Sequence, residues 1–337
     1  MKEKTKGLVV SFISVVISFL SLLLMMKLAV RVDPALAHRE WVRILSFDQP
    51  TSIIRQPLNA DWLPPTWFPE SSRDELWVLQ GIRNKPKSKK KLRLKSRAAI
   101  VYDLDRGEVL FEKNADTRWP VASLTKVVSA LALASMGGDL DQEQCLDRTI
   151  YANFPGATTR FRSGSCVKGW DLLGSALVGS DNGGAFGLAH VADVPHGPFI
   201  DQMNSVAAEL EMSSSSFVDP AGVNDENIST ARDVTRAVVA LSKHPTLSVA
   251  ASAPFWDVDF GEDRGKRTYY STNRYAQSSG FEFSAAKTGF TYTARNCFTA
   301  VVTRKGRTLA VTTLGAYYKK DRWKDFKKLV DWSIKNK

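Results

Sequence analysis

One stretch, Trp119 to Leu133, constrains the fold of this chain more than any other. Pro120 suits the first turn of a helix, apolar side chains recur at helical spacing, and Gly137-Gly138 provides a stop. The pattern predicts a buried helix. Ser123 and Lys126 are three residues apart and so share one face, near the end where unpaired N–H groups point outward. Such a pair is typical of a nucleophile beside its base.

Three other Ser-x-x-Lys matches occur, and their contexts argue against them. Ser88 to Lys91 lies in a run of lysines with nothing apolar to dock it. Ser165 to Lys168 sits between two glycines, where no helix is expected. Ser284 to Lys287 lies in a strand-like stretch, where residues three apart face opposite ways. Only Ser123 has the helix that the geometry needs.

The composition is that of a globular protein, and the charge is unevenly distributed. The 337 residues are 44% hydrophobic and 24% charged, with a net charge of +11. Residues 98–337 hold 28 Lys and Arg against 27 Asp and Glu, so they are nearly neutral and give no support to nucleic-acid binding. The four histidines and three cysteines form no cluster with zinc spacing, so we predict no metal and no cofactor.

The cysteines leave two interpretations open. Cys145 and Cys166 flank a predicted hairpin, so they could form a disulfide in an oxidising compartment, with Cys297 left as a buried thiol. The alternative is three unpaired cysteines in the core.

The N-terminus predicts a membrane segment. Residues 7–26 carry no charge, follow Lys2, Lys4 and Lys6, and are long enough as a helix to cross a bilayer. An uncleaved anchor is favoured over a signal peptide cleaved near Ala37, because the apolar run is long and Lys27 and Arg31 intervene. Either way the rest of the chain is expected on the periplasmic side of the inner membrane, in the cell envelope.

Residues 38–97 are predicted to form a spacer with short packed pieces, since tryptophans and prolines alternate there without a sustained period. Its end, Arg83 to Arg97, has nine basic residues and no acidic one. This run predicts a solvated tether. The alternative is that it binds anionic lipid headgroups or anionic wall polymers.

Residues 98–337 have the regular pattern of one α+β domain, whose expected elements follow in chain order. They are a hairpin of residues 99–103 and 108–112, the Ser123 helix, strands around Cys145 and Cys166, helices at 170–178, 199–211 and 229–242, strands at 282–288, 297–303 and 308–314, and a closing basic helix at 319–337 with Trp323, Phe326, Leu329, Val330 and Trp332 on its apolar face.

Three motifs follow one another in this domain: Ser123-x-x-Lys126, Ser180-Asp181-Asn182 and Lys287-Thr288-Gly289. This set is found in serine β-lactamases and penicillin-binding proteins. Over about residues 97–337 the chain resembles the active-site-serine DD-peptidases, specifically the low-molecular-mass penicillin-binding carboxypeptidases and endopeptidases. The contexts Ala122–Lys126, Ser229–Asp233 and Ala286–Thr291 carry the resemblance as well.

The resemblance implies an antiparallel β-sheet flanked by helices, with a helical subdomain, and a role for each residue. Ser123 is the nucleophile, a neutral Lys126 its base, and Ser180 the proton relay to the leaving amine. Asn182 holds Lys126 and the substrate backbone. The expected oxyanion donors are the N–H groups of Ser123 and Phe290. Lys287 and Thr288 bind a substrate carboxylate, Lys287 lends charge that lowers the pKa of Lys126, and Gly289 leaves room for the acyl group.

The implied substrates are peptidoglycan stem peptides, with β-lactams as covalent inhibitors. Gly183-Gly184-Ala185 departs from the Asp-Ala of many carboxypeptidases, while Arg295-Asn296-Cys297 and the absence of a further β-rich domain favour an endopeptidase that cuts D-Ala–meso-diaminopimelate cross-links. A D-Ala-D-Ala carboxypeptidase and a penicillin-binding sensor or scaffold remain alternatives. No carboxylate stands out as a water activator, although Asp219, Asp225 and Glu226 lie in a suitable loop. We therefore expect a β-lactam target and not a β-lactamase.

Overall fold

The computed structural model describes residues 64–86, 92–146, 158–261 and 264–335. The predicted membrane segment at residues 7–26 lies outside these ranges. Within them, no helix combines the length and the apolar character that crossing a membrane requires. The helices are α3 (Glu70–Arg73), α4 (Thr125–Ser135), α5 (Gly169–Leu177), α6 (Asn182–Val191), α7 (His196–Glu209), α8 (Ala231–Lys243), α9 (Pro245–Ser252) and α10 (Lys319–Lys335), with 3₁₀ helices η1 (Asp74–Arg83) and η2 (Ala122–Leu124).

A five-stranded antiparallel sheet forms the centre of the fold, as expected. Its order is β2-β1-β11-β10-β9, and in the described part of the chain three short two-stranded pairs, β3-β6, β4-β5 and β7-β8, lie outside it. The strands are β1 (Ala98–Asp103), β2 (Glu108–Lys113), β3 (Trp119–Pro120), β4 (Glu143–Leu146), β5 (Ser165–Lys168), β6 (Ile228–Ser229), β7 (Phe255–Asp259), β8 (Lys266–Tyr270), β9 (Glu282–Thr291), β10 (Arg295–Arg304) and β11 (Arg307–Ala316). Because β9 is an edge strand, one side of its backbone is not paired within the sheet.

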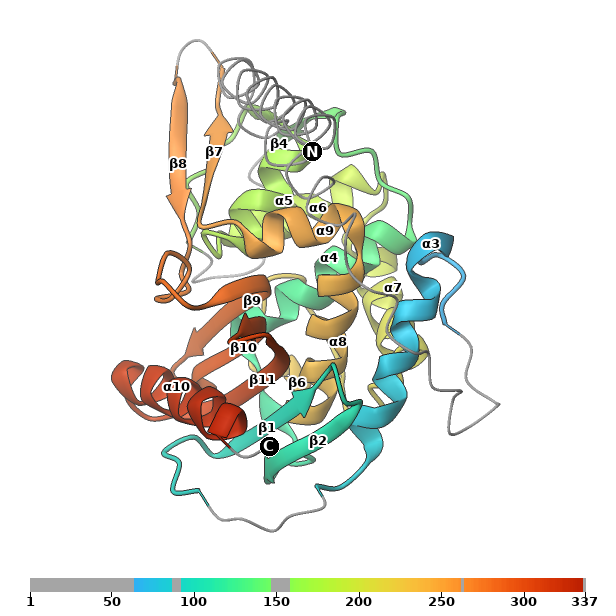
Figure 1. Ribbon diagram of the computed structural model, residues 1–337. Coiled ribbons are helices and arrows are strands. Elements are labelled where there is room, and N and C mark those ends of the chain that lie inside the picture. Colours follow the sequence, from blue (N-terminus) through green and yellow to red (C-terminus); the bar gives the residue numbers. More distant parts are fainter. Residues whose placement is uncertain (1–63, 87–91, 147–157, 262–263, 336–337) are drawn as a thin grey trace, which may run out of the picture. The chain divides into compact units, whose positions relative to one another are not determined.

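Helices cover both faces of the sheet (Figure 1). On one face α10 packs Trp323, Phe326 and Leu329 against Phe298 and other sheet residues, as its predicted apolar stripe required. On the other face α8 lies against β10 and β11, and its Thr235 hydroxyl is 2.7 Å from the hydroxyl of Thr312 in β11. The sheet is therefore buried on both sides, which fixes the position of its edge strand β9.

The start of the predicted Ser123 helix is wrong. Trp119 and Pro120 form the short strand β3 paired with β6, and the α-helix begins only at Thr125 after the 3₁₀ turn η2. Ala122 adopts φ +48°, which an α-helix cannot contain. A strand partner more than a hundred residues away therefore overrides the local helical pattern.

Two helices of the described part of residues 98–337, α6 and α9, were not predicted. Residues 182–191 form α6, despite glycines that weaken an isolated helix. Close packing against α5 explains the glycine at 184, because a Cβ there would lie 2.2 Å from Oγ of Ser175 in α5. Figure 1 shows α4, α5, α6 and α9 grouped beside the sheet.

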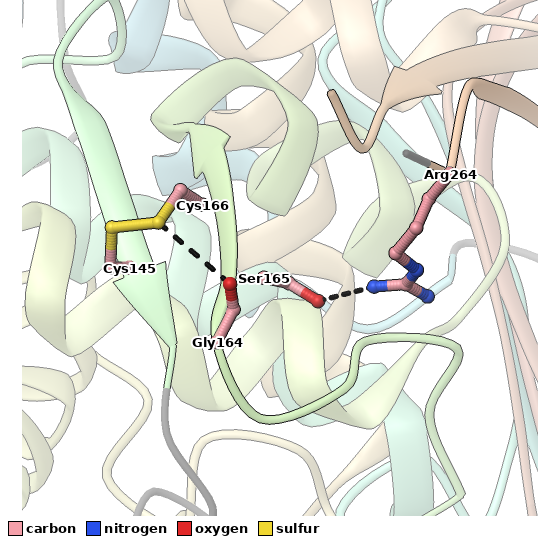
Figure 2. Close-up of a disulfide and its surroundings, with 5 residues drawn as sticks. All are labelled: Cys145, Gly164, Ser165, Cys166 and Arg264. Atoms are coloured by element: carbon pink, nitrogen blue, oxygen red, sulfur yellow. Dashed lines mark hydrogen bonds between the residues drawn. A yellow bond between two sulfur atoms is a disulfide. The ribbon is translucent and has the colours of Figure 1, made fainter. Parts of the chain in front are cut away.

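Of the two interpretations left open for the cysteines, the structure has the disulfide, between Cys145 and Cys166 (Figure 2). These residues face each other in the register of β4 and β5, with their Cα atoms 3.9 Å apart. Next to the bond, the guanidinium of Arg264 donates to Oγ of Ser165 at 2.6 Å. Cys297 is a buried free thiol, as expected, and burial raises its pKa to about 12.

The described part of the predicted spacer packs into the main core. Phe68, Leu76, Leu79 and Ile82 are each no more than 1% exposed. The buried Arg232 of α8 ties this segment down by donating to the carbonyl of Ile82 at 2.5 Å. Packed pieces within residues 38–97 were expected, and these residues form one core with the sheet domain.

Candidate active site

Ser123 lies at the point where η2 passes into α4. The left-handed conformation of Ala122, unusual for a residue with a side chain, turns the chain sharply just before the serine. Ser123 is half-buried, whereas Ala122 and Leu124 on either side are buried. The turn therefore presents the hydroxyl from an otherwise buried backbone.

Lys126 is fully buried, and its amine has three neighbours at hydrogen-bond distance. Nζ lies 2.9 Å from Oγ of Ser123, 2.8 Å from Oδ1 of Asn182 and 2.6 Å from the carbonyl oxygen of Ala221. A neutral amine has two N–H groups and one lone pair. The oxygens of Asn182 and Ala221 can only accept, so they take the two N–H groups of Lys126. The lone pair of Nζ is left to accept from the hydroxyl of Ser123. This geometry is that of a base oriented toward its nucleophile.

Burial also gives this amine the protonation state that a base needs. It lowers the pKa of Lys126 to about 7, although the charges of Asp219 and Asp181 act in the opposite direction. Burial, the charge of Lys126 and the charge of Arg322 together lower the pKa of Lys287 well below its usual value. Burial therefore accounts for the lowered pKa of Lys126, and the repulsion between the lysines acts on Lys287.

The loop at Asp219, whose role toward Lys126 the sequence did not indicate, holds the third partner of this amine. The buried carboxylate of Asp219 accepts from the N–H groups of Ala221 at 2.8 Å and Gly222 at 2.7 Å, and from the side chain of Asn227. These bonds curl the loop so that the Ala221 carbonyl meets Nζ. Because further N–H groups, of Val223 and Asn224, also bind it, the Asp219 carboxylate is not free to activate water.

Gly222 allows this loop to touch the turn that carries the serine. It has φ +74°, and a Cβ there would lie 2.0 Å from the carbonyl oxygen of Ala122. Glycine is therefore required both by the backbone conformation and by the close approach.

The Ser180-Asp181-Asn182 motif forms the turn between α5 and α6. Ser180 has φ +60° and is half-buried, and Nζ of Lys287 donates to its Oγ at 2.7 Å. Asp181 caps α6 by accepting from the N–H of Gly184 at 3.1 Å, and it also accepts from Oγ1 of Thr159 at 2.6 Å. The aspartate thus orients the two residues that face the lysines.

The Lys287-Thr288-Gly289 motif lies on the edge strand β9. The hydroxyl of Thr288 donates to Oγ1 of Thr272 at 2.7 Å. Gly289 has a second reason that the sequence did not indicate: a Cβ there would lie 2.7 Å from the carbonyl of Val121 and 3.3 Å from the N atom of Leu124. Glycine therefore lets β9 approach the turn that carries Ser123, which joins the two halves of the site.

Phe290, the next residue, has an exposed side chain at the end of β9. Arg322 of α10 reaches the same strand from the opposite side and donates to the carbonyls of Gly289 at 3.3 Å and Cys297 at 3.1 Å. Nothing in the sequence pattern singles out this arginine, because it lies within a helix already rich in basic residues.

The structure thus brings together every residue predicted for the site. Ser123, Lys126 and Asn182 form one hydrogen-bonded chain, Ser180 and Lys287 form a second, and the contact of Gly289 with η2 places the chains side by side. The other two Ser-x-x-Lys matches in the described residues, at Ser165 and Ser284, lie in strands β5 and β9. The arrangement is that of an enzyme using serine and lysine for acyl transfer.

Comparison with known proteins gives the family. The model of peptidase family S11, D-alanyl-D-alanine carboxypeptidase, matches residues 85–317. The D-alanyl-D-alanine endopeptidase of Pseudomonas aeruginosa is 30% identical over 71% of this chain and 77% of its own length. The endopeptidase of Escherichia coli K12 is 27% identical over 70% and 76%. Among solved structures, penicillin-binding protein D2 of Listeria monocytogenes in its cefotaxime-bound form has a TM-score of 0.62 and 30% identity, covering 72% of this chain and 98% of that one.

The chain is therefore a serine peptidase of the DD-peptidase class. It belongs to peptidase family S11.

Proposed function

We propose that this protein is an endopeptidase that hydrolyses D-Ala–meso-diaminopimelate cross-links between peptidoglycan stem peptides, through an acyl-enzyme on Ser123. The observation that carries the proposal is the buried amine of Lys126, held between Ser123, Asn182 and Ala221. The choice of the cross-link as substrate rests on the two relatives named endopeptidases.

The reaction has two stages. Neutral Lys126 takes the hydroxyl proton of Ser123 as Oγ attacks the D-alanyl carbonyl. The resulting oxyanion is held by the backbone N–H groups of Ser123 and Phe290. The hydroxyl of Ser180, fixed by Lys287, gives its proton to the leaving amine and receives in return the proton that Lys126 took from Ser123, so that the amide bond breaks and an ester on Ser123 remains. Water then cleaves the ester, and Ser123 recovers its proton.

The remaining residues hold the substrate. Asn182 offers its N–H groups to the substrate backbone while its oxygen accepts from Lys126. The outer side of β9 pairs with the extended peptide as an added strand would. Lys287 and Thr288 bind the carboxylate of the leaving part.

β-Lactams acylate the same serine, and the acyl-enzyme is long-lived. The structure offers Asp219 no role in deacylation, because N–H groups already occupy both of its oxygens. The Listeria protein in its cefotaxime-bound form supports this reading.

The proposal places the enzyme on the periplasmic side of the inner membrane, anchored by residues 7–26. The uncharged length of that segment and the lysines before it support the anchor. The Cys145–Cys166 disulfide supports an oxidising compartment outside the cytoplasm.

Digestion of purified cross-linked muropeptides tests the proposal. Release of monomers from dimers is expected, and it must disappear in Ser123→Ala. Loss of the terminal D-Ala from a pentapeptide, with dimers left intact, would establish a D-Ala-D-Ala carboxypeptidase, the activity named in the family description. Penicillin labelling without either reaction would leave a sensor or scaffold.

A further inference from the structure

Exposed aromatic side chains gather at one end of the sheet. Phe290, Tyr292, Tyr317 and Tyr318 are 53%, 84%, 60% and 58% exposed. Phe290 lies at the end of β9, Tyr292 directly follows that strand, and Tyr317 and Tyr318 follow β11. We call these four residues the aromatic rim. A group of apolar rings exposed to water is unfavourable in free energy, and such patches on a protein surface often mark binding sites.

The rings of the rim are held in order. The centroids of Phe290 and Tyr292 are 5.8 Å apart, and those of Tyr317 and Tyr318 are 4.7 Å apart. Between the two pairs, Arg295 begins β10 with φ +60° and places its guanidinium 4.7 Å from the centroid of Tyr317. The left-handed φ closes the turn between β9 and β10, and the guanidinium lies beside the ring of Tyr317.

The turn below the rim is fixed as well. The indole N–H of Trp119 donates to the carbonyl of Ala294 at 2.8 Å, and the hydroxyl of Thr291 donates to Asp225 at 2.8 Å. The rim therefore stands on a rigid base that is continuous with the strand before Ser123.

In the proposed mechanism the rim lies on the acyl side of the reacting bond. Lys287 and Thr288 hold the leaving part, so the peptide that becomes the acyl group runs from the oxyanion donor Phe290 toward Tyr292. The last two residues of β9 and the first residue of the following turn lead from Gly289 to Tyr292, a span of up to roughly 10 Å, and two strand spacings from β9 to β11 add a similar distance sideways. About three stem residues precede the reacting D-alanine, which also span roughly 10 Å when extended. Tyr292, Tyr317 and Tyr318 are thus at the distance where the stem peptide joins its sugar, while Phe290 begins the rim at the reacting bond.

We propose that the aromatic rim binds the disaccharide that carries the acyl-donor stem peptide, an inference that rests on the function proposed above. Sugar rings have apolar C–H faces bordered by hydroxyl groups. Tyrosine matches both, because it presents an apolar ring with a polar tip. The enzyme accordingly selects cross-links whose donor stem is still attached to glycan.

The test compares two substrates with the full-length protein in detergent. One is a cross-linked muropeptide dimer with its disaccharides, and the other is the same dimer after an amidase has removed the sugars. The wild type is expected to show a kcat/KM about tenfold higher for the sugar-bearing dimer. The double variant Tyr292→Ala, Tyr317→Ala is expected to lose this preference, while its kcat/KM for the sugar-free dimer stays within about twofold.

Tyr270→Ala is the matched control, because Tyr270 is also exposed, at 71%, but lies on β8 away from the rim. It must keep the preference. Equal losses on both substrates in the double variant would show that the rim binds peptide, and an unchanged preference would show that it binds nothing; either result overturns the inference. Penicillin labelling of Ser123 distinguishes failure of the sugar-binding inference from failure of the proposed endopeptidase function. Labelled protein that cleaves neither dimer would refute both proposals. Wild-type protein that cleaves both dimers without a preference for the sugar-bearing one would refute the sugar-binding inference alone.

Discussion

The protonation of Lys126 should control how fast Ser123 is acylated. With a pKa of about 7, roughly half of the buried amines are neutral at pH 7, against about one in 3000 for a lysine with the ordinary value of 10.5. Since only the neutral amine can accept a proton, acylation should rise about tenfold per pH step below pH 6 and level off above pH 8.

Asn182→Asp tests this reasoning most sharply, because it places a carboxylate where Oδ1 now lies 2.8 Å from Nζ. A negative charge at that distance raises a lysine pKa by roughly 1 to 3. Acylation at pH 7 should therefore fall by about five- to five-hundredfold and recover at pH 9 to 10. Asn182→Leu, the matched control, supplies no charge and should be slow without recovery.

The assay is the rate of labelling by a fluorescent penicillin between pH 5 and 10, with circular dichroism to confirm that each variant is folded. A wild-type rate that does not change with pH would refute the reasoning. So would a folded Asn182→Asp protein whose rate rises at the same pH as that of the wild type.

Three further predictions concern the framework. The double variant Cys145→Ser, Cys166→Ser should lower the free energy of unfolding by about 3 kcal/mol, because the unfolded chain gains entropy when a link across 21 residues is opened. Urea denaturation of the variant and of the wild type with its disulfide intact measures the difference. Gly222→Ala, with its Cβ forced against the Ala122 carbonyl, should lose about 1 to 3 kcal/mol of stability and slow penicillin labelling at every pH; an unaffected labelling rate would contradict the role given to the loop. Burial lowers the pKa of His244 to about 4 from an ordinary 6.5, so the stability that the neutral imidazole contributes is complete above pH 6.5 and is lost as the pH falls toward 4. The loss should be on the order of 3 kcal/mol in the free energy of unfolding, measured by urea denaturation at each pH. His244→Asn should remove this loss, and a variant with the same pH dependence of stability as the wild type would contradict the prediction.

The sequence predicted those parts of the fold whose pattern is local. The strands and the apolar stripe of α10 follow from side-chain period, and their positions agree with the structure to within a few residues. The start of the Ser123 helix was mispredicted because Trp119 and Pro120 pair with β6, a contact that periodicity does not encode. Helix α6 was missed because its glycines oppose helix formation until α5 packs against them.

The site residues with reactive side chains could be found from the motifs, whereas the groups that orient them could not. The carbonyl of Ala221 is a backbone atom and has no signature in the sequence. Asp219 stood out only as a carboxylate in a suitable loop, and its actual partners are N–H groups of its own turn. The second reason for Gly289 was likewise hidden, because it depends on how closely β9 approaches η2.

The most direct test of the central claim is the mass of the tryptic peptide Trp119–Lys126 after the protein has been exposed to penicillin. A covalent penicilloyl group on Ser123 is predicted, and a folded Ser123→Ala protein should carry none. An adduct on any other residue, or labelling that persists in the Ser123→Ala protein, would contradict the account.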